Sequence, residues 1–266
     1  MHHHAEFDAD ELALVKGGQT ISVCLPARDE ATTVGAIVRT LRAELVEATG
    51  LVDEVLVEHG AGTGKGEALW KSVAAAEGDL IVWCDADIVD FDARFVVGLI
   101  GPLLTRPEIG FVKGYYDRPI DGVPSTGGRV TELVARPLIA LLFPRLGNIV
   151  QPLSGEYAGR REALEAVPFV QGYGVDLGLL IDISARFGLD TIAQVDLGVR
   201  HHRNRTLEQL SPQALAVMQT AFAKAHVATQ TGSAPTLVRP GSEDLTLRHV
   251  ERPPLAELAS YLRRLA

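Results

Sequence analysis

The first 117 residues alternate between short apolar runs and segments with helical spacing. After Val34, apolar residues recur every three or four positions, at Ile37, Val38, Leu41 and Leu45, as on one face of an amphipathic helix. The apolar runs are TISVCLP (20–26), DEVLV (53–57), DLIVWCD (79–85) and IGFVKGYY (109–116). Such near-continuous apolar strands are typical of a sheet buried on both faces. The alternation predicts an α/β fold, with a Rossmann-like, mostly parallel sheet and helices on both faces.

The second half of the chain is less regular. It predicts helices over 129–143 and 175–188, a turn at PLSGEYA (152–158), a strand over 191–198 and a long helix from about Leu207. Prolines and glycines then loosen residues 232–241 before a last short helix over 255–265. We therefore expect one α/β domain in two halves, residues 18–117 and 118–231, followed by a C-terminal extension over 232–266.

Composition excludes several classes of protein. A formal charge of −9 and a pI near 5.4 argue against a nucleic-acid partner. The longest apolar stretches fall short of the ~18 residues that a membrane span requires, so no membrane partner is expected. Two cysteines without CxxC spacing indicate neither a disulfide framework nor a zinc site, and a cytoplasmic location is expected. The opening MHHH resembles an expression tag and has no signal-peptide hydrophobic region.

Three polar or glycine-rich segments follow the predicted strands of the first half. They read PARDE, VEHGAGTGKG and CDADIVD. Because parallel sheets bind ligands at the carboxyl ends of their strands, we expect the three segments to line one crevice.

The segment around Lys65 has the strand, glycine loop and helix order of a phosphate-binding loop. The G-x-x-x-x-G-K-[ST] pattern, however, needs glycine where His59 stands and a hydroxyl where Gly66 stands. A P-loop phosphotransferase, in which the strand over 79–85 ends in a metal-binding aspartate, remains an alternative, and so does a plain turn.

Asp85 and Asp87 follow a buried strand two residues apart, so both carboxylates can face one ion. Hard oxygen ligands at this spacing suit Mg²⁺ or Mn²⁺ carrying a diphosphate. The alternative is a pair of solvated aspartates that cap the next helix. Similarly, VRHHRNR (199–205) contains imidazoles that can complete a metal shell and arginines that can hold an anion, or it is an ordinary solvated basic surface.

Two further motifs have carboxylates or anion-binding groups beside glycines. STGGRVTELVARP opens a helix whose first turn offers free backbone N–H groups, Arg129 and Thr131, a suitable site for phosphate or carboxylate, although an ordinary helix start has the same pattern. Glu156 and Asp176 stand beside glycines, where a carboxylate can accept hydrogen bonds from sugar hydroxyls.

Taken together, these motifs resemble a known enzyme family. The matching segments are LPARDE, GKGEALW, CDAD, TGGRVTELVARPL, QPLSGEYA, GYGVDLGLLID and LGVRHHRNR. In sequence and order they resemble glucosyl-3-phosphoglycerate synthases and the related mannosyl-3-phosphoglycerate synthases, which are retaining GT-A glycosyltransferases of family 81. The resemblance covers roughly residues 20–230. It implies a GT-A fold and transfer of glucose or mannose from UDP-glucose or GDP-mannose to the 2-hydroxyl of 3-phosphoglycerate, with Mg²⁺ or Mn²⁺ and as a homodimer.

The resemblance also implies a role for individual residues. The nucleotide sugar would contact Pro26, Ala27, Arg28, Glu30, Lys65, Asp85, Ala86 and Gly155. The metal would be held by Asp87 and His202. The acceptor would contact Gly128, Arg129, Thr131 and Asn204. Catalysis would involve Asp87, Asp176 and Lys65. On this basis residues 18–117 form the nucleotide-sugar half and residues 118–231 the acceptor half.

Several points stay open in the sequence. Retention can follow from front-face attack, or from double displacement through Asp176 or Glu156. The segments at 58–64 and RPIDGVPSTGG are shorter than those of the family, and Asp176 stands where a glutamate is expected. The choice between glucose and mannose, and between UDP and GDP, is not readable, and a sugar-nucleotide sensor without turnover is a non-enzymatic alternative.

Overall fold

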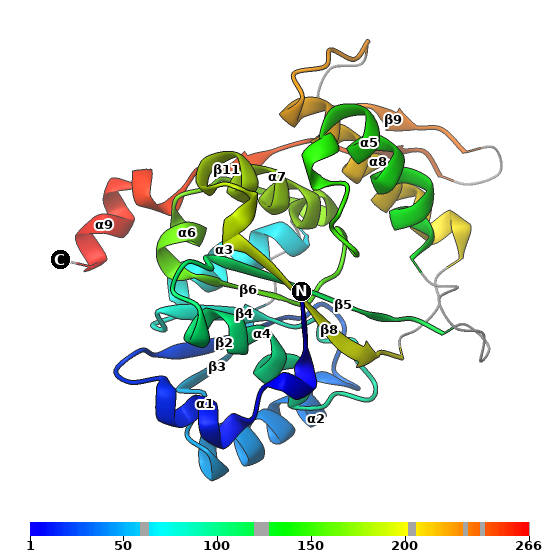
Figure 1. The fold of residues 1–266 in the computed structure, drawn as a ribbon. Helices are drawn as coiled ribbons and strands as arrows, with labels where there is room; N and C mark the ends of the chain where they lie inside the picture. Colours follow the sequence, from blue (N-terminus) through cyan, green and yellow to red (C-terminus); the bar gives the residue numbers. More distant parts are fainter. Residues whose placement is uncertain (59–63, 120–127, 202–205, 231–233, 240–242, 266) are drawn as a thin grey trace.

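The computed structural model describes residues 1–58, 64–119, 128–201, 206–230, 234–239 and 243–265. Its centre is a seven-stranded sheet with the order β1-β8-β5-β6-β4-β2-β3 (Figure 1). The strands are β1 (His2–His3), β2 (Ile21–Pro26), β3 (Glu54–Glu58), β4 (Leu80–Trp83), β5 (Phe111–Asp117), β6 (Tyr157–Arg160) and β8 (Ile192–Val199). In this described sheet β6 runs antiparallel to both neighbours, and the other pairs are parallel. The predicted mostly parallel α/β sheet is confirmed.

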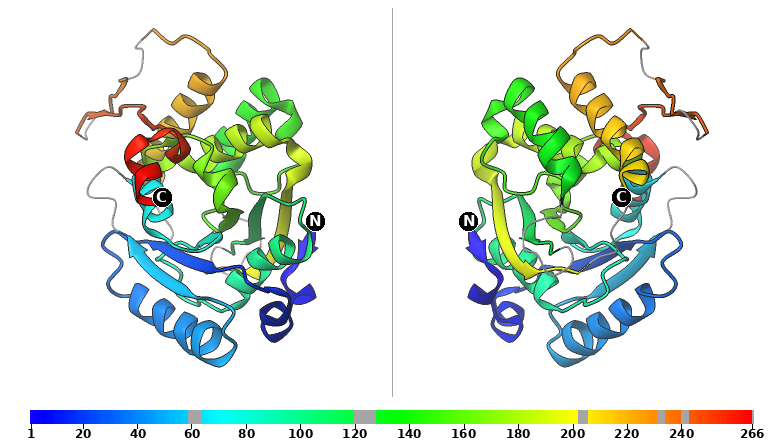
Figure 2. Two further views of the ribbon diagram at one scale, coloured as in Figure 1. Left: turned by 90° about the vertical axis from the view of Figure 1, so that its left-hand side faces the viewer. Right: turned by 90° about the vertical axis from the view of Figure 1, so that its right-hand side faces the viewer.

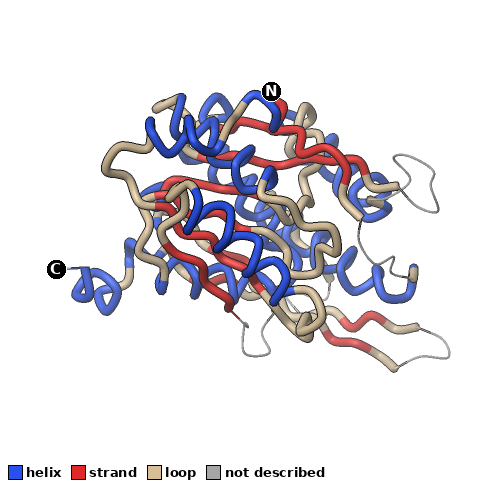
Figure 3. The backbone as a smooth tube through the Cα atoms, turned by 90° about the horizontal axis from the view of Figure 1, so that it is seen from below, coloured by secondary structure: helices blue, strands red, loops and turns tan. Residues whose placement is uncertain are grey.

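Helices cover both faces of the sheet (Figure 3). One face carries α1 (Ala9–Val15), α2 (Val34–Thr40), its π-helical continuation η2 (Leu41–Ala48) and α4 (Arg94–Thr105). The other face carries α3 (Lys65–Ala75), α6 (Arg161–Glu165), α7 (Val175–Phe187) and α9 (Ala259–Leu265). This arrangement follows from the strands, which are apolar on both sides and bury both.

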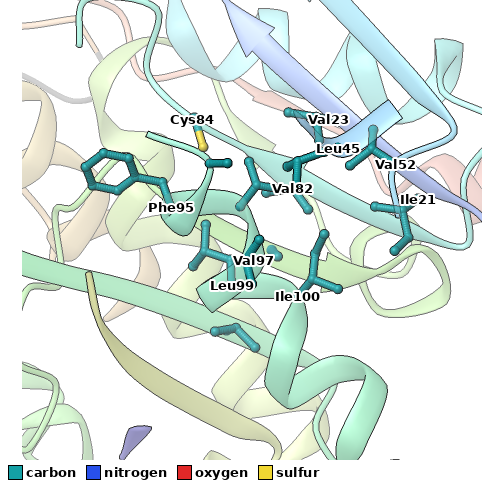
Figure 4. Close-up of a cluster of buried hydrophobic side chains, with 14 of the residues drawn as sticks. Ile21, Val23, Leu45, Val52, Val82, Cys84, Phe95, Val97, Leu99 and Ile100 are labelled. Atoms are coloured by element: carbon teal, nitrogen blue, oxygen red, sulfur yellow. The ribbon is translucent and has the colours of Figure 1, made fainter. Parts of the chain in front are cut away.

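The first face forms a dense apolar core (Figure 4). Val23 of β2 and Val82 of β4 meet Leu45 of η2 and Leu99 of α4, and all four side chains are fully or almost fully buried. Because apolar side chains fill the centres of these strands, polar groups can be placed only in the loops that follow them.

A second layer of helices lies beyond α7. It consists of the π-helical segment η3 (Thr131–Ala135), α5 (Arg136–Leu142), the 3-10 turn η4 (Pro144–Leu146) and α8 (Leu207–Lys224). A capping box starts α8: the Thr206 hydroxyl accepts from the Gln209 N–H while the Gln209 side chain accepts from the Thr206 N–H. Apolar side chains of α5, α7 and α8 form a separate cluster there.

The C-terminal residues run back over the body of the protein (Figure 2). Strands β9 (Thr236–Leu237) and β10 (Leu245–Thr246) pair with each other, and β11 (Glu251–Arg252) pairs with β7 (Phe169–Val170). The remaining elements are short 3-10 turns, η1 (His4–Glu6), η5 (Gly172–Gly174), η6 (Leu189–Thr191) and η7 (Leu255–Glu257).

One sequence prediction is wrong in part. The turn predicted at 152–158 ends in β6, whose residues Tyr157 and Ala158 pair with β4 and β5. The short YAGR segment, with its glycine, has no strand pattern of its own and is fixed by its neighbours. The tag-like histidines His2 and His3 form β1 beside β8. Within the described residues, no helix has the length and apolar character needed to cross a membrane.

Candidate active site

The polar segments predicted to converge do meet at one end of the sheet. Asp85 and Asp87 follow β4, Lys65 opens α3 shortly after β3, and Arg200 follows β8. Glu156 joins them from the opposite direction. Because β6 is antiparallel, it begins where its neighbours end, so the residue that precedes it lies at the same edge.

Lys65 is held between two carboxylates. Its ammonium Nζ lies 2.9 Å from Asp85 Oδ1 and 3.2 Å from Asp176 Oδ1. Burial alone would lower the pKa of Lys65, but the Asp176 and Asp85 carboxylates outweigh it and hold that pKa well above its ordinary value. The ammonium is therefore a fixed positive charge at this edge of the sheet.

Arg200 joins three carboxylates. Its Nη2 lies 3.3 Å from Asp85 Oδ2 and 2.7 Å from Asp87 Oδ1, while its Nη1 lies 3.1 Å from Glu156 Oε1. The same Nη1 donates to the Tyr116 hydroxyl at 2.7 Å. The guanidinium is almost fully buried, so these contacts are little screened by water. Arg200 therefore fixes the orientation of Asp85 and Asp87.

The carboxylates of this cluster titrate differently because their surroundings differ. Burial would raise the pKa of Asp85, but Lys65 and Arg200 hold it well below its ordinary value. Burial raises the pKa of Glu156 in spite of Arg200. Asp85 thus stays ionised at neutral pH, whereas the charge on Glu156 depends on its arginine.

Lys113 of β5 and Tyr157 of β6 support the cluster from the neighbouring strands. Lys113 Nζ donates to the Ser154 carbonyl at 2.8 Å and lies 4.2 Å from the centroid of the Tyr157 ring. The Tyr157 hydroxyl donates to Asp176 Oδ1 at 3.0 Å. Burial lowers the pKa of Lys113 to about 8. These contacts hold the turn before β6 and the carboxylate of Asp176 in place.

Gly155 lies directly against Asp85. A Cβ atom at position 155 would stand 2.1 Å from Asp85 Oδ2 and 2.4 Å from its Cγ, so glycine is required for the close approach. This contact places the predicted Gly155 beside Asp85, at the edge of the sheet where the charged cluster lies.

The PARDE segment lies beside the aspartates. The Thr33 hydroxyl donates to the Ala86 carbonyl at 2.6 Å, which joins this segment to the loop after β4. Ala27, next to Pro26 at the end of β2, donates its N–H to the Glu58 carbonyl at 2.9 Å. Arg28 is exposed, and Glu30 precedes α2. The predicted nucleotide segment therefore borders the predicted metal site.

The predicted acceptor residues lie at the start of the second layer of helices. Gly128 has a φ of +82°, a conformation that glycine adopts without strain, and its carbonyl accepts from the Glu132 N–H at 3.0 Å. Arg129 follows, and Thr131 is buried. The helix they begin packs through Val134 and Leu138 in the same apolar cluster as α7, which carries Asp176. Their acceptor role stays a prediction.

The described residues fit a divalent metal in part. Asp85 and Asp87 each direct an oxygen at the same Arg200 nitrogen, so the two carboxylates can face one cation, as Mg²⁺ or Mn²⁺ requires. Among the described residues, no group of three or more His, Cys, Asp or Glu side chains is arranged as a metal site. The predicted ligand His202 and the predicted acceptor residue Asn204 lie outside the described residues.

Sequence reasoning missed part of the cluster and misplaced another part. Tyr116, Lys113 and Tyr157 were not singled out, because aromatic and basic residues inside apolar strands look like core. Glu156 was expected near sugar hydroxyls, but its side chain is fully buried and bound by Arg200, so it cannot reach a sugar. Arg200 was expected to hold an anionic ligand and is instead bound to carboxylates of the chain.

Comparisons with known proteins give one consistent result, although no family model matches the chain. The sequence is 40% identical to glucosyl-3-phosphoglycerate synthase of Petrotoga mobilis, over 97% of this chain and 94% of the relative. It is 42% identical to the enzyme of the same name from Mycolicibacterium smegmatis, over 93% of each chain. The alignment with the Petrotoga enzyme extends over 305 positions, more than the 266 residues here, so the relative has internal residues that this chain lacks. This agrees with the expectation that some segments of this chain are shorter than those of the family.

Solved structures agree with the sequence relatives. A crystal structure of glucosyl-3-phosphoglycerate synthase from Mycobacterium tuberculosis in complex with Mn²⁺, UDP-glucose and phosphoglyceric acid matches with a TM-score of 0.83 and 40% identity. The match covers 94% of this chain and 95% of that one. Structures of the same enzyme with Mn²⁺, UDP and the product glucosyl-3-phosphoglycerate, and with Mg²⁺ and UDP, match with a TM-score of 0.83 each.

Proposed function

This chain belongs to the glucosyl-3-phosphoglycerate synthase family of hexosyltransferases, and on that premise we propose that it transfers glucose from UDP-glucose to the 2-hydroxyl of 3-phosphoglycerate. The proposal is supported by relatives that match over almost their full length and by crystal complexes of the Mycobacterium tuberculosis enzyme with UDP-glucose, phosphoglyceric acid and product. The observation that carries it is the buried cluster in which Lys65, Asp85, Asp87 and Asp176 meet. Family membership also argues against a P-loop phosphotransferase.

The proposed reaction requires Mg²⁺ or Mn²⁺, the ions named with the Mycobacterium tuberculosis enzyme. Asp87 and His202 would hold the ion, with Asp85 directly or through water. A bound divalent cation would stabilise the negative charge of the leaving diphosphate. Arg200 helps to hold the pKa of Asp85 below its ordinary value and orients both Asp85 and Asp87, so their oxygens are positioned to bind a cation.

Lys65 would act on the diphosphate as a second positive charge. Its ammonium is held by Asp85 and Asp176 and stays protonated at neutral pH. A fixed charge next to a leaving phosphate lowers the barrier because it is already oriented before the reaction. Pro26, Ala27, Arg28, Glu30 and Ala86 would surround the nucleotide, and Gly128, Arg129, Thr131 and Asn204 would bind the acceptor. The half formed by 18–117 would thus hold the donor, and 118–231 the acceptor.

Retention of the anomeric configuration is best explained by front-face attack. Double displacement needs a carboxylate that reaches the anomeric carbon, and the buried Glu156 cannot do so. Asp176 remains a candidate, but Lys65 and the Tyr157 hydroxyl both bind its Oδ1. If Asp176 were the nucleophile, an Asp176→Ala variant would regain turnover with azide and form a glucosyl azide. We expect no such product by mass spectrometry.

The direct test is turnover with defined substrates. The protein is incubated with Mg²⁺, 3-phosphoglycerate and either UDP-glucose or GDP-mannose, and released nucleotide and sugar product are measured. We expect UDP release and α-linked glucosyl-3-phosphoglycerate. Product from GDP-mannose alone would assign the donor differently, and no turnover with either donor would refute the proposal. Tight UDP-glucose binding without any product would favour a sensor.

We also propose that the enzyme is a homodimer in the cytoplasm. Two-fold association is what the family resemblance implies. Both cysteines are free and buried, as suits a reducing compartment. Sedimentation that detects only monomer at micromolar concentration would contradict the dimer.

A further inference from the structure

The C-terminal segment reaches the beginning of α3, the helix that carries Lys65. Its strand β11 pairs with β7, with Glu251 opposite Val170 and Arg252 opposite Phe169. The N–H of Gln171 donates to the Val250 carbonyl at 2.8 Å and extends this pairing. In both views of Figure 2 the red C-terminal segment lies beside the cyan α3. Residues near the end of the chain are thereby placed next to the first turn of an early helix.

Arg252 makes a two-point ion pair with Glu67 in that first turn. Its Nε lies 2.6 Å from Glu67 Oε2, and its Nη2 lies 2.8 Å from Oε1, although 185 residues separate the partners. Gln171 Nε2 donates to the same Oε2 at 2.9 Å. The hydrogen bond from Arg252 lowers the pKa of Glu67, whose side chain is almost fully buried. A buried carboxylate held at both oxygens is fixed in direction as well as in position.

Trp70, one turn further along α3, adds a second attachment. Its indole Nε1 donates to the Pro253 carbonyl at 2.9 Å. The Arg252 guanidinium carbon lies 5.4 Å from the centroid of the Trp70 ring. The arginine is therefore stacked on the helix that its ion pair fixes.

The first turn of α3 also has no room to move against β7 and η5. A Cβ at Gly66 would stand 1.8 Å from the Val170 carbonyl oxygen, and a Cβ at Gly64 would stand 2.7 Å from Gly172 Cα. The backbone of the turn is thus packed against β7 and η5, and its Glu67 side chain is bound by Arg252. Lys65 lies between Gly64 and Gly66, so the contacts of these two glycines with η5 and β7 fix the position of its backbone.

We propose that Arg252 is a positioning residue for Lys65: it locks the first turn of α3 and so holds the Lys65 ammonium between Asp85 and Asp176. This inference deepens the proposed function, because it assigns the C-terminal segment a part in binding the donor diphosphate. Arg252 itself touches Glu67 and Trp70 rather than the reacting groups. Its effect on the reaction passes through Lys65.

The first test measures the position of Lys65 without any substrate. The rate at which a small acylating reagent modifies Lys65 is followed by peptide mass spectrometry in wild type, Arg252→Ala and Arg252→Lys. Lys16 is the internal reference, because its ammonium is also held by a carboxylate, at 2.7 Å from Asp53, and its side chain is 10% exposed against 13% for Lys65. Arg263→Ala, at an exposed position of α9 in the same segment, is the matched control variant.

We expect the Lys65 rate to rise about tenfold in Arg252→Ala, because a loosened ammonium leaves the Asp85 and Asp176 carboxylates and becomes accessible to the reagent. Arg252→Lys should lie between this variant and wild type, since one ammonium replaces a two-point contact. Lys16 should not change in any variant, and Arg263→Ala should equal wild type. An unchanged Lys65 rate in a folded Arg252→Ala protein, or equal increases at Lys65 and Lys16, would overturn the inference whatever the enzyme's substrate is.

The second test asks whether the effect on ligand passes through Lys65. UDP affinity with Mg²⁺ is measured by calorimetry in wild type, Lys65→Ala, Arg252→Ala and the double variant. We expect Lys65→Ala to weaken binding about tenfold or more, Arg252→Ala about threefold to tenfold, and the double variant no more than Lys65→Ala alone. Equal effects of Arg252→Ala in both backgrounds would mean general destabilisation and would refute positioning. Failure of wild type to bind UDP would refute the proposed function instead, and the acylation result would still decide the role of Arg252.

Discussion

Replacing Arg200 with methionine removes the cation that three carboxylates share while keeping an apolar side chain of similar length. Glu156 is the partner that suffers most, because its side chain is fully buried and lies 3.1 Å from the arginine. Removing one partner of a buried ion pair typically costs about 3–5 kcal/mol of folding free energy. Asp85 and Asp87 are each 26% exposed, so water offsets part of the ion-pair free energy that they lose. The total loss of folding free energy therefore stays in this range.

The cost in Arg200→Met should depend on pH with a definite sign. Burial already raises the pKa of Glu156, and loss of the arginine raises it further. Between the ordinary pKa of a glutamate and this raised value, the native state binds a proton that the unfolded state does not. Stability of the variant therefore falls as pH rises through that window, by about 1.4 kcal/mol for each unit by which the Glu156 pKa of the folded variant exceeds the ordinary glutamate value.

Guanidinium chloride unfolding at pH 5 and pH 8 measures both effects. We expect Arg200→Met to lose about 3–5 kcal/mol at pH 8 and less at pH 5, because a larger fraction of Glu156 is protonated at the lower pH. Arg42→Met is the control, because Arg42 pairs with Glu47 at the surface with 64% of its side chain exposed, and it should cost less than about 1 kcal/mol at either pH. A loss below about 1 kcal/mol at pH 8 in Arg200→Met, or a loss that does not change between the two pH values, would refute this account of the cluster.

Three further predictions follow from the same cluster. Gly155→Ala should leave the fold intact but reduce turnover at least about tenfold, because the new methyl displaces the Asp85 carboxylate; turnover within about twofold of wild type would contradict the contact. Asp87→Ala and His202→Ala should each abolish Mg²⁺-dependent turnover without lowering the melting temperature by more than a few degrees, and a wild-type rate in either variant removes that residue as a ligand. Because burial lowers the Lys113 pKa to about 8, the unfolded chain binds the extra proton between that value and the ordinary pKa. Lys113 should therefore add about 2–3 kcal/mol to the free energy of unfolding of wild type between pH 8 and pH 10. If denaturant unfolding of Lys113→Met shows the same increase between these pH values as wild type, this account is refuted.

The sheet and the main site were predictable because their signals are local. Apolar strands with polar ends place Lys65 and Asp85 at one edge of a parallel sheet, whatever their sequence separation. The direction of β6 was not predictable, because the four-residue YAGR segment contains no alternation and takes its direction from the strands on both sides. The position of Glu156 was not predictable for the same reason, because Glu156 reaches the site only if β6 runs antiparallel to its neighbours.

Burial, rather than residue type, decides the roles that sequence reasoning assigned wrongly or missed. Arg200 in a basic run looks like a ligand for anions, but its guanidinium is enclosed by carboxylates of the chain itself. Lys113 was not singled out within its apolar strand, and its role follows only from the Tyr157 ring and the Ser154 carbonyl that lie against its ammonium. Both depend on contacts between segments more than forty residues apart, which no periodicity records.

The pairing of Arg252 with Glu67 also has a consequence for how the chain is made. Ribosomes add about 5–20 residues per second, so the 185 residues between these partners take about 10–40 s to synthesise. During this interval Glu67 has no arginine to pair with, and the start of α3 lacks the contact that Arg252 makes. The nascent chain can build its sheet as the strands emerge, but Lys65 can be locked in place only after Arg252 has been made.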